Sequence, residues 1–247
     1  MPYPIQWILS LIFVVQMYLA MLVLAIVFTP FAMINRVYAY AACRTYCRWV
    51  RFSARWLVGL RSDIRGDIPT DEVLIASKHQ SFFDIIMIVS VVPRPKFIMK
   101  KQLSLTPIVG YYAKRIGCVA VDRGKRGQAI KKMVADVKSG STLPGQLIIF
   151  PQGTRVAAGV HMPYKVGTGV LYEQTGQGIV PAATNVGVFW PRRGVYRARG
   201  LAVVEFLPRI TPGKPIKEVM TELEEVIETA SDQLMAEAGF TLPSRAT

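Results

Sequence analysis

The stretch VLIASKHQSFFDIIMIVS, residues 73–90, decides the fold. It begins with a short apolar run, Val73–Ala76, which has the length of a buried strand, and it ends with a longer apolar run typical of a buried helix. The polar residues between the two runs include Lys78, His79 and Asp84. A strand, a turn and a helix form the unit of an open α/β sheet, and active sites of such sheets collect in these turns.

His79 and Asp84 are the candidate chemical pair of this turn. If Ser81 is the N-cap of the helix, Asp84 is its third residue, a capping-box spacing with Asp in place of Glu. The bent chain then lets the carboxylate fold back onto the imidazole, as in a general base and the acid that orients it. The same spacing also suits an Asp84 that only caps the helix and a His79 that only fills the turn. The pair alone leaves both interpretations open.

Composition indicates an anionic partner. The 247 residues are 51% hydrophobic, and the net charge of +14 favours nucleic acid, phospholipid head groups or a phosphorylated substrate. The length allows one core, or one core and a membrane segment. Three cysteines, Cys43, Cys47 and Cys118, make no disulfide framework, which indicates a reducing compartment. The two histidines are far from the cysteines in sequence, so we expect no metal site.

The N-terminus predicts a membrane segment. No charged side chain occurs up to Asn35, and Ile5–Val27 is apolar almost throughout, long enough to cross a hydrocarbon core of about 30 Å. We expect Pro30 to end or kink this helix. The run is too long for a signal peptide and lacks a basic region before it. A tilted span and a helical hairpin that dips into one leaflet both remain open.

The segment after this run is rich in arginine and aromatic residues. Few acids occur among its arginines, which predicts a cytoplasmic face by the positive-inside rule and an interfacial helix on an anionic membrane. A solvated basic helix is the simpler alternative. We therefore expect residues 1–66 to form a membrane-associated helical region and residues 67–247 to form the globular domain. The arginines are Arg36, Arg44, Arg48, Arg51, Arg55, Arg61 and Arg65.

Short apolar runs recur through the globular part, with helical patterns such as Ala129–Val137 between several of them. Strands that alternate with helices predict an α/β sheet covered on both sides. Lys217–Ala238 has apolar residues at helical spacing with acids opposite and Gly239 as its stop, so we expect a packing helix without chemistry. The predicted strands are Val73–Ala76, Phe97–Met99, Cys118–Val121, Leu147–Phe150, Ile179–Ala183 and Leu201–Leu207.

Three further stretches combine a strand end, glycine or proline, and a cation. They are MKKQL at 99–103, VDRG at 121–124 and FPQGTR at 150–155. Glycine permits a close backbone approach, and arginine offers a fork for phosphate. Between residues 94 and 132 there are eleven Lys or Arg and one acid, Asp122. Each stretch alone is typical of a structural turn, but together they predict a cationic edge of the sheet beside His79.

These stretches resemble the motifs of the glycerolipid acyltransferases. HQSFFD at 79–84 resembles their H-x4-D motif, and KKQL at 100–103, with Pro107, Gly110 and Asp122-Arg123, resembles the second block. FPQGTR resembles the third block and Val180-Pro181 the fourth, in the order of the 1-acylglycerol-3-phosphate acyltransferase (bacterial PlsC-like) branch. The likeness covers residues 73–186 and implies a mixed α/β sheet covered by helices, like that of glycerol-3-phosphate acyltransferase, behind a membrane-embedded helical segment.

The resemblance implies acyl transfer from acyl-CoA or acyl-carrier protein to the sn-2 hydroxyl of lysophosphatidic acid, without a further cofactor. His79 would be the general base, oriented by Asp84, at a membrane and on its cytoplasmic side. Lys101 or Lys100, Arg123 and Arg155 would hold the phosphate. The substrate-binding residues implied are Lys100, Lys101, Arg123, Phe150, Pro151, Gln152, Gly153, Thr154 and Arg155.

One residue departs from the family pattern, because Gln152 stands where a glutamate is usual. We expect it to position neighbouring groups rather than to act as a carboxylate. Another acceptor, such as glycerol 3-phosphate, another lysophospholipid or a lyso-aminolipid, remains an alternative. A non-catalytic protein that binds anionic lipids is a more distant one. Nucleic acid is not an expected partner, and His161 is expected to be an ordinary surface residue.

Overall fold

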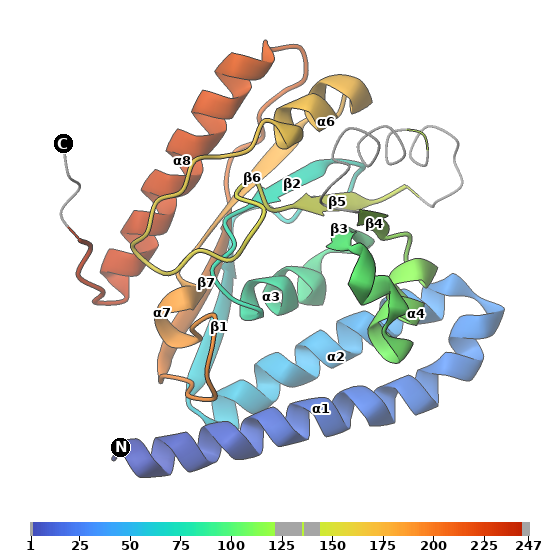
Figure 1. The fold of residues 1–247 in the computed structure, drawn as a ribbon, viewed down its shortest axis with the longest axis vertical. Helices are drawn as coiled ribbons and strands as arrows, with labels where there is room; N and C mark the ends of the chain where they lie inside the picture. The colour runs from blue at the N-terminus through green and yellow to red at the C-terminus, as the bar shows by residue number, and fades with distance from the viewer. Residues whose placement is uncertain (1, 122–134, 136–143, 244–247) are drawn as a thin grey trace.

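The computed structural model describes residues 2–121, 135 and 144–243, and these residues form one mixed sheet with helices on both faces (Figure 1). The strands are β1 (Leu60–Arg65), β2 (Leu74–Ser77), β3 (Pro95–Lys100), β4 (Val119–Val121), β5 (Gln146–Ile149), β6 (Ile179–Thr184) and β7 (Gly200–Phe206). The helices are α1 (Tyr3–Ile34), α2 (Arg36–Leu57), α3 (Phe83–Val91), η1 (Lys101–Leu105), α4 (Pro107–Arg115), α6 (Gly167–Thr175), α7 (Val186–Phe189) and α8 (Ile216–Glu237). The predicted fold class, a mixed α/β sheet covered by helices, is confirmed.

The sheet has the strand order β1-β7-β6-β2-β5-β3-β4. Strands β2 to β6 run parallel to one another, whereas β7 is antiparallel to β6 and pairs in parallel with β1. The carboxyl ends of five strands therefore meet at one edge. The segments that follow β2, β3, β4 and β5 contain the four cationic and polar stretches expected to share a site.

Two cores cover the two faces of the sheet because strand side chains alternate between faces. Val73 and Ile75 belong to the core that contains residues of α1, α2 and α3. Leu74 and Ala76 belong to the core that contains residues of α6 and α8. Figure 1 shows the same division, with α3, α2 and α1 stacked on one side and α8 and α6 on the other. This alternation continues into the turn after β2 and decides which way its side chains point.

All six predicted strands are present, but the sequence analysis missed β1. Its sequence, LRSDIR, pairs along its whole length with β7 at the edge of the sheet. The expected boundary at residue 66 therefore falls at the end of a strand of the sheet, and residues 1–66 contribute to the globular core. The predicted C-terminal helix is α8, and the predicted helix Ala129–Val137 lies outside the described residues except for residue 135.

Of the two effects expected of Pro30, ending the helix is wrong, because α1 continues to Ile34, and a kink stays a prediction. Tertiary contacts hold this last turn: Thr29 shares a hydrogen bond of 3.2 Å with Tyr112 of α4, and Ala32 is fully buried. The break comes at Asn35, which is extended and whose Oδ1 accepts a hydrogen bond from the Val37 amide at 2.9 Å. This single residue separates α1 from α2, which run side by side (Figure 1).

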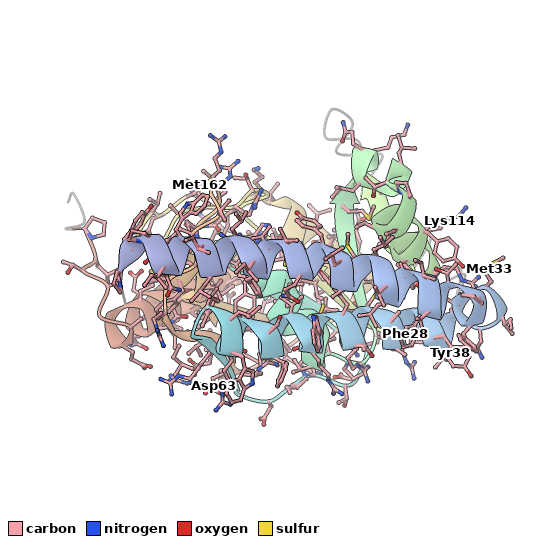
Figure 2. All side chains as sticks on the ribbon, turned by 90° about the horizontal axis from the view of Figure 1, so that it is seen from below. Phe28, Met33, Tyr38, Asp63, Lys114 and Met162 are labelled. Atoms are coloured by element: carbon pink, nitrogen blue, oxygen red, sulfur yellow. The ribbon has the colours of Figure 1, made fainter. Side chains whose placement is uncertain are left out.

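Helix α1 is packed against the domain along one side and exposes an apolar surface on the other. Near its start, the Gln6 amide donates to the carbonyls of Val58 and Arg197, each at 2.8 Å. In its middle, Phe13 packs edge-on against Trp190, and near its end Arg115 donates to the Ala32 carbonyl. Figure 2 shows α1 in front of the domain in this view, with α2 beside it. Its exposed residues include Ile8, Ile12, Val15, Leu19, Leu22, Val23, Ile26 and Val27.

Candidate active site

His79 and Asp84 are in direct contact in the turn between β2 and α3. The His79 Nδ1 lies 3.0 Å from Oδ1 and 3.2 Å from Oδ2 of Asp84. The Asp84 carboxylate is fully buried and also accepts hydrogen bonds from the amides of Gln80 and Ser81 at 2.9 and 2.8 Å. The backbone thus fixes the carboxylate, and the carboxylate fixes the imidazole. A histidine held in this way at Nδ1 can take up a proton at Nε2.

The start of α3 differs from the predicted one. The helix begins at Phe83, one residue later than a Ser81 N-cap requires, and Phe82 occupies the N-cap position. The Ser81 hydroxyl still accepts a hydrogen bond from the Phe83 amide at 3.3 Å, while Asp84 accepts one from the Ser81 amide. Asp84 therefore holds the helix start and the imidazole at once. The structure therefore shows both the contact with the imidazole and the capping contacts, and the chemical role of the pair stays a prediction.

The loop after β5 lies over the imidazole. The Phe150 ring stacks on His79 with centroids 4.0 Å apart and an angle of 20° between the planes. Phe97 of β3 stacks on Phe150 in turn, at 6.4 Å. At the other end of the loop, the Val156 amide donates to the His79 carbonyl at 2.7 Å. These contacts join residues 150–156 to the His79 turn, and 14% of the His79 side chain remains exposed.

The residues between Phe150 and Val156 have different surroundings. Pro151 and Gln152 are buried, and Thr154 and Arg155 are half-buried. Gly153 has a φ of 69°, a left-handed conformation that favours glycine, and its amide donates to the Phe150 carbonyl at 2.8 Å. This amide therefore closes the turn that begins at Phe150.

Arg155 has a cationic neighbour that the sequence analysis did not consider. Its Nη1 donates to the Arg192 carbonyl at 3.2 Å, and the Arg192 Nη1 donates back to the Arg155 carbonyl at 3.3 Å. Both side chains lie beside the loop that is joined to His79. Arg192 follows Trp190, whose ring stacks on Phe83 of α3 with centroids 5.0 Å apart. This second loop therefore places an exposed arginine near the same turn.

The other predicted phosphate-binding residues lie at the same sheet edge by topology. Lys100 ends β3, and Lys101, which is exposed, begins η1 directly after it. Arg123 lies outside the described residues, two positions after the end of β4. The contacts described here therefore bring His79, Asp84, Phe150 and Arg155 together. Lys100 and Lys101 are placed at this edge by the end of β3 alone.

The sequence analysis missed a buried polar cluster behind this turn. Lys78 is fully buried, and its Nζ pairs with the Glu228 carboxylate of α8. Glu228 also accepts a hydrogen bond from the Tyr164 hydroxyl at 2.9 Å and faces the Gln152 Nε2 at 3.5 Å. Burial, followed by the Glu228 charge, holds the pKa of Tyr164 well above its ordinary range, so its hydroxyl stays a donor. Removing one partner of such a buried pair costs about 3–5 kcal/mol.

His161 belongs to this cluster, so the expectation of an ordinary surface residue is wrong. Its Nδ1 lies 2.8 Å from Glu228 Oε2, and its Nε2 lies 3.3 Å from Asp232 Oδ2, while 38% of its side chain is exposed. The sequence held two signals for the cluster. Lys78 directly follows a buried strand, and Glu228 lies on the same face of α8 as the buried residues Ser231 and Met235. Among the described residues there is no group of three side chains that could hold a metal ion.

The chain is similar to known acyltransferases. A family model described as "Acyltransferase" matches residues 61–185. The 1-acyl-sn-glycerol-3-phosphate acyltransferase of Pseudomonas aeruginosa is 26% identical over 196 residues, which cover 78% of this chain and 76% of that protein. The Saccharomyces cerevisiae 1-acyl-sn-glycerol-3-phosphate acyltransferase is 27% identical over 191 residues, which cover 74% of this chain and 63% of that protein. The 1-acyl-sn-glycerol-3-phosphate acyltransferase alpha of Mus musculus is 30% identical over 138 residues, which cover 54% of this chain and 48% of that protein.

A solved structure has the same fold. The crystal structure of the 1-acyl-sn-glycerophosphate (LPA) acyltransferase, PlsC, from Thermotoga maritima superposes with a TM-score of 0.76 and 18% identity. The match covers 92% of this chain and 97% of that one.

Proposed function

Because the chain belongs to the acyltransferase family, we propose that it transfers a fatty acyl group from acyl-CoA or acyl-carrier protein to the sn-2 hydroxyl of lysophosphatidic acid. The product is phosphatidic acid, a step of phospholipid synthesis. The observation that carries the proposal is the His79–Asp84 pair, held at the carboxyl edge of the sheet beside Arg155. The names of the matched relatives support the choice of acceptor.

We propose direct transfer with His79 as the general base. Asp84 holds Nδ1, so Nε2 removes the proton from the acceptor hydroxyl. The oxygen attacks the thioester carbonyl, the new C–O bond forms and the C–S bond breaks. The proton held by His79 passes to the departing thiolate. No covalent acyl-enzyme intermediate forms. The stacked Phe150 limits the orientations of the ring during both transfers.

The acceptor phosphate is proposed to bind to cations at the same sheet edge. Arg155 is the best supported of these, because the amide of the next residue, Val156, donates a hydrogen bond to the His79 carbonyl. Lys100, Lys101 and Arg123 are proposed partners from the neighbouring strand ends. Gln152 is buried, faces Glu228 of α8 and positions the loop of residues 150–155. Phe82, Leu103 and Leu105 expose apolar side chains on the segments at this edge, as a lipid substrate requires.

We propose that α1 and α2 lie along the membrane in one leaflet. Helix α1 has 32 residues, or about 48 Å, and by length and composition it is long and apolar enough to cross a membrane. It is nevertheless tied to the domain from Gln6 to Ala32, so it cannot leave the domain to cross a bilayer upright. Its exposed apolar side can enter the acyl-chain region instead. The arginines of α2 favour the anionic cytoplasmic surface, where the proposed active site then lies.

The test is an acyl-transfer assay with purified protein in lipid vesicles. Lysophosphatidic acid, glycerol 3-phosphate and other lysophospholipids are offered as acceptors, each with acyl-CoA and with acyl-carrier protein. We expect turnover with lysophosphatidic acid, and we expect His79→Ala to lower it by at least about a hundredfold, since general-base catalysis contributes about 10²–10⁴-fold. Vesicle binding should persist in this variant. Turnover of His79→Ala near that of the unaltered protein would rule out the mechanism.

A further inference from the structure

Glu228 of α8 reaches the back of both turns that form the candidate active site. Lys78 is one residue before His79, and Gln152 is two residues after Phe150. Lys78 and His79 are adjacent, so alternation directs them to opposite faces. Phe150 and Gln152 are separated by the turn after β5, so that Phe150 stacks on His79 while Gln152, like Lys78, meets Glu228. One carboxylate from a distant helix thus contacts the turn after β2 and the turn after β5.

We propose that Glu228 is a positioning residue for acyl transfer, acting through Lys78 on the His79 turn and through Gln152 on the loop 150–155. This inference rests on the function proposed above and goes beyond it, because Glu228 itself lies behind the sheet and touches no reacting group. Glu228 is 5% exposed as a whole residue, and its carboxylate has four nitrogen or hydroxyl groups around it, on Lys78, Gln152, His161 and Tyr164. A buried charge with so many fixed donors holds their backbone segments in one geometry.

The side chains of Gln152 and Glu228 together set the net charge of the buried cluster around Lys78. Lys78 supplies the fully buried ammonium of the cluster, and Glu228 supplies the carboxylate that neutralises it. Gln152 is fully buried, and its Oε1 has no hydrogen-bond partner among the described residues. An acid at 152 would therefore add a second buried negative charge beside Glu228. Moving the acid from 228 to 152 would keep the charge of the cluster unchanged.

The first experiment is Glu228→Gln, assayed as above with lysophosphatidic acid. We expect kcat to fall about a hundredfold, because a displacement of about 1 Å in a catalytic group costs that much. The KM values for both substrates should change much less, since no substrate contact is removed. The matched control is Glu225→Gln, an exposed glutamate on the same helix, which should leave kcat and KM unchanged. Unchanged kcat in Glu228→Gln would overturn the proposal.

The second experiment exchanges the two side chains. Gln152→Glu alone should be poorly active, because it places two carboxylates around one ammonium. The double variant Gln152→Glu/Glu228→Gln restores one acid and one amide, and we expect it to be at least about tenfold more active than Glu228→Gln, as a coupled charge pair requires. A loss that only reflects damaged packing would not recover in this way. A double variant no better than Glu228→Gln would overturn the proposal.

A third variant tests the proposal if the Glu228→Gln protein does not fold. Lys78→Met/Glu228→Met replaces the buried pair by apolar groups, an exchange that many proteins tolerate without loss of stability. We expect cooperative thermal unfolding close to that of the unaltered protein but a low kcat, because Gln152 and Tyr164 lose their acceptor. Full activity of this variant would overturn the positioning role. Absence of turnover in the unaltered protein with every acceptor would instead refute the proposed function.

Discussion

Lys78 and His79 follow each other in the chain but serve opposite faces of the sheet. Lys78 is fully buried against α8, whereas the His79 ring stacks on Phe150 and keeps some exposure. The turn after β2 is therefore held from both sides, by an ion pair behind it and by the Asp84 carboxylate in front of it. A turn fixed in this way can keep an imidazole in one orientation without a covalent constraint.

Arg155→Ala tests whether Arg155 binds the phosphate of the acceptor. If Arg155 binds the phosphate, its removal raises the KM for lysophosphatidic acid by about tenfold or more, since a charged hydrogen bond contributes about 1.5–3 kcal/mol. The effect on kcat should be smaller, because the His79–Asp84 pair remains. Steady-state kinetics at varied acceptor concentration measure both constants.

Arg209→Ala is the matched control for this experiment. Arg209 is exposed and pairs with Asp71, which precedes β2 and so lies at the opposite edge of the sheet. Its loss should leave both constants unchanged. A KM for lysophosphatidic acid that is equal in Arg155→Ala and Arg209→Ala would show that Arg155 does not bind the phosphate.

Sequence distance explains which contacts of the site could be predicted. The His79–Asp84 contact spans five residues within one turn, so local geometry suffices to predict it. Lys78 and Glu228 are 150 residues apart, and no local rule connects them. A lysine after a buried strand indicates that an acid must lie nearby, but only the fold identifies the helix that supplies it.

At the scale of elements, burial decides what could be predicted. Strands β2, β5 and β6 are buried along their length, so each reads as a continuous apolar run in the sequence. Strand β1 lies at the edge, and most of its residues are exposed or half-buried, so LRSDIR resembles a loop. Pro30 does not end α1 for a related reason, because contacts with α4 hold the helix where local propensity would end it.

Helix α1 allows a direct test of membrane docking. Val23 and Ile26 are exposed neighbours on its outer face, at 57% and 66%. Val23→Glu/Ile26→Glu should weaken binding to anionic vesicles by at least about tenfold, because each carboxylate placed in the acyl-chain region costs on the order of 2–3 kcal/mol. Co-sedimentation with vesicles measures the bound fraction.

The control for this test adds two acids elsewhere. Thr221→Glu/Gln233→Glu places them at exposed positions of α8, on the face of the molecule opposite to α1. Both double variants have the same net charge, so a difference between them reports the position of the charges. Equal vesicle binding of the two variants would contradict docking through α1.

At the scale of the whole molecule, the charge and the apolar surface act together. In the proposed docking, the net charge of +14 favours an anionic lipid surface, and the exposed side of α1 provides the apolar contact. Figure 2 shows Lys114 and Met162 on the same side of α1, with Asp63 on the opposite side.

The attachment of α1 along the domain has a consequence for kinetics. An enzyme that docks through a helix bound from Gln6 to Ala32 meets its acceptor in two dimensions, within the bilayer plane. Its rate should therefore follow the mole fraction of lysophosphatidic acid in the vesicle, and adding inert phospholipid at constant bulk acceptor should slow it in proportion. A rate that ignores this surface dilution would indicate an acceptor taken from solution. In that case the long apolar helix would serve as an anchor alone.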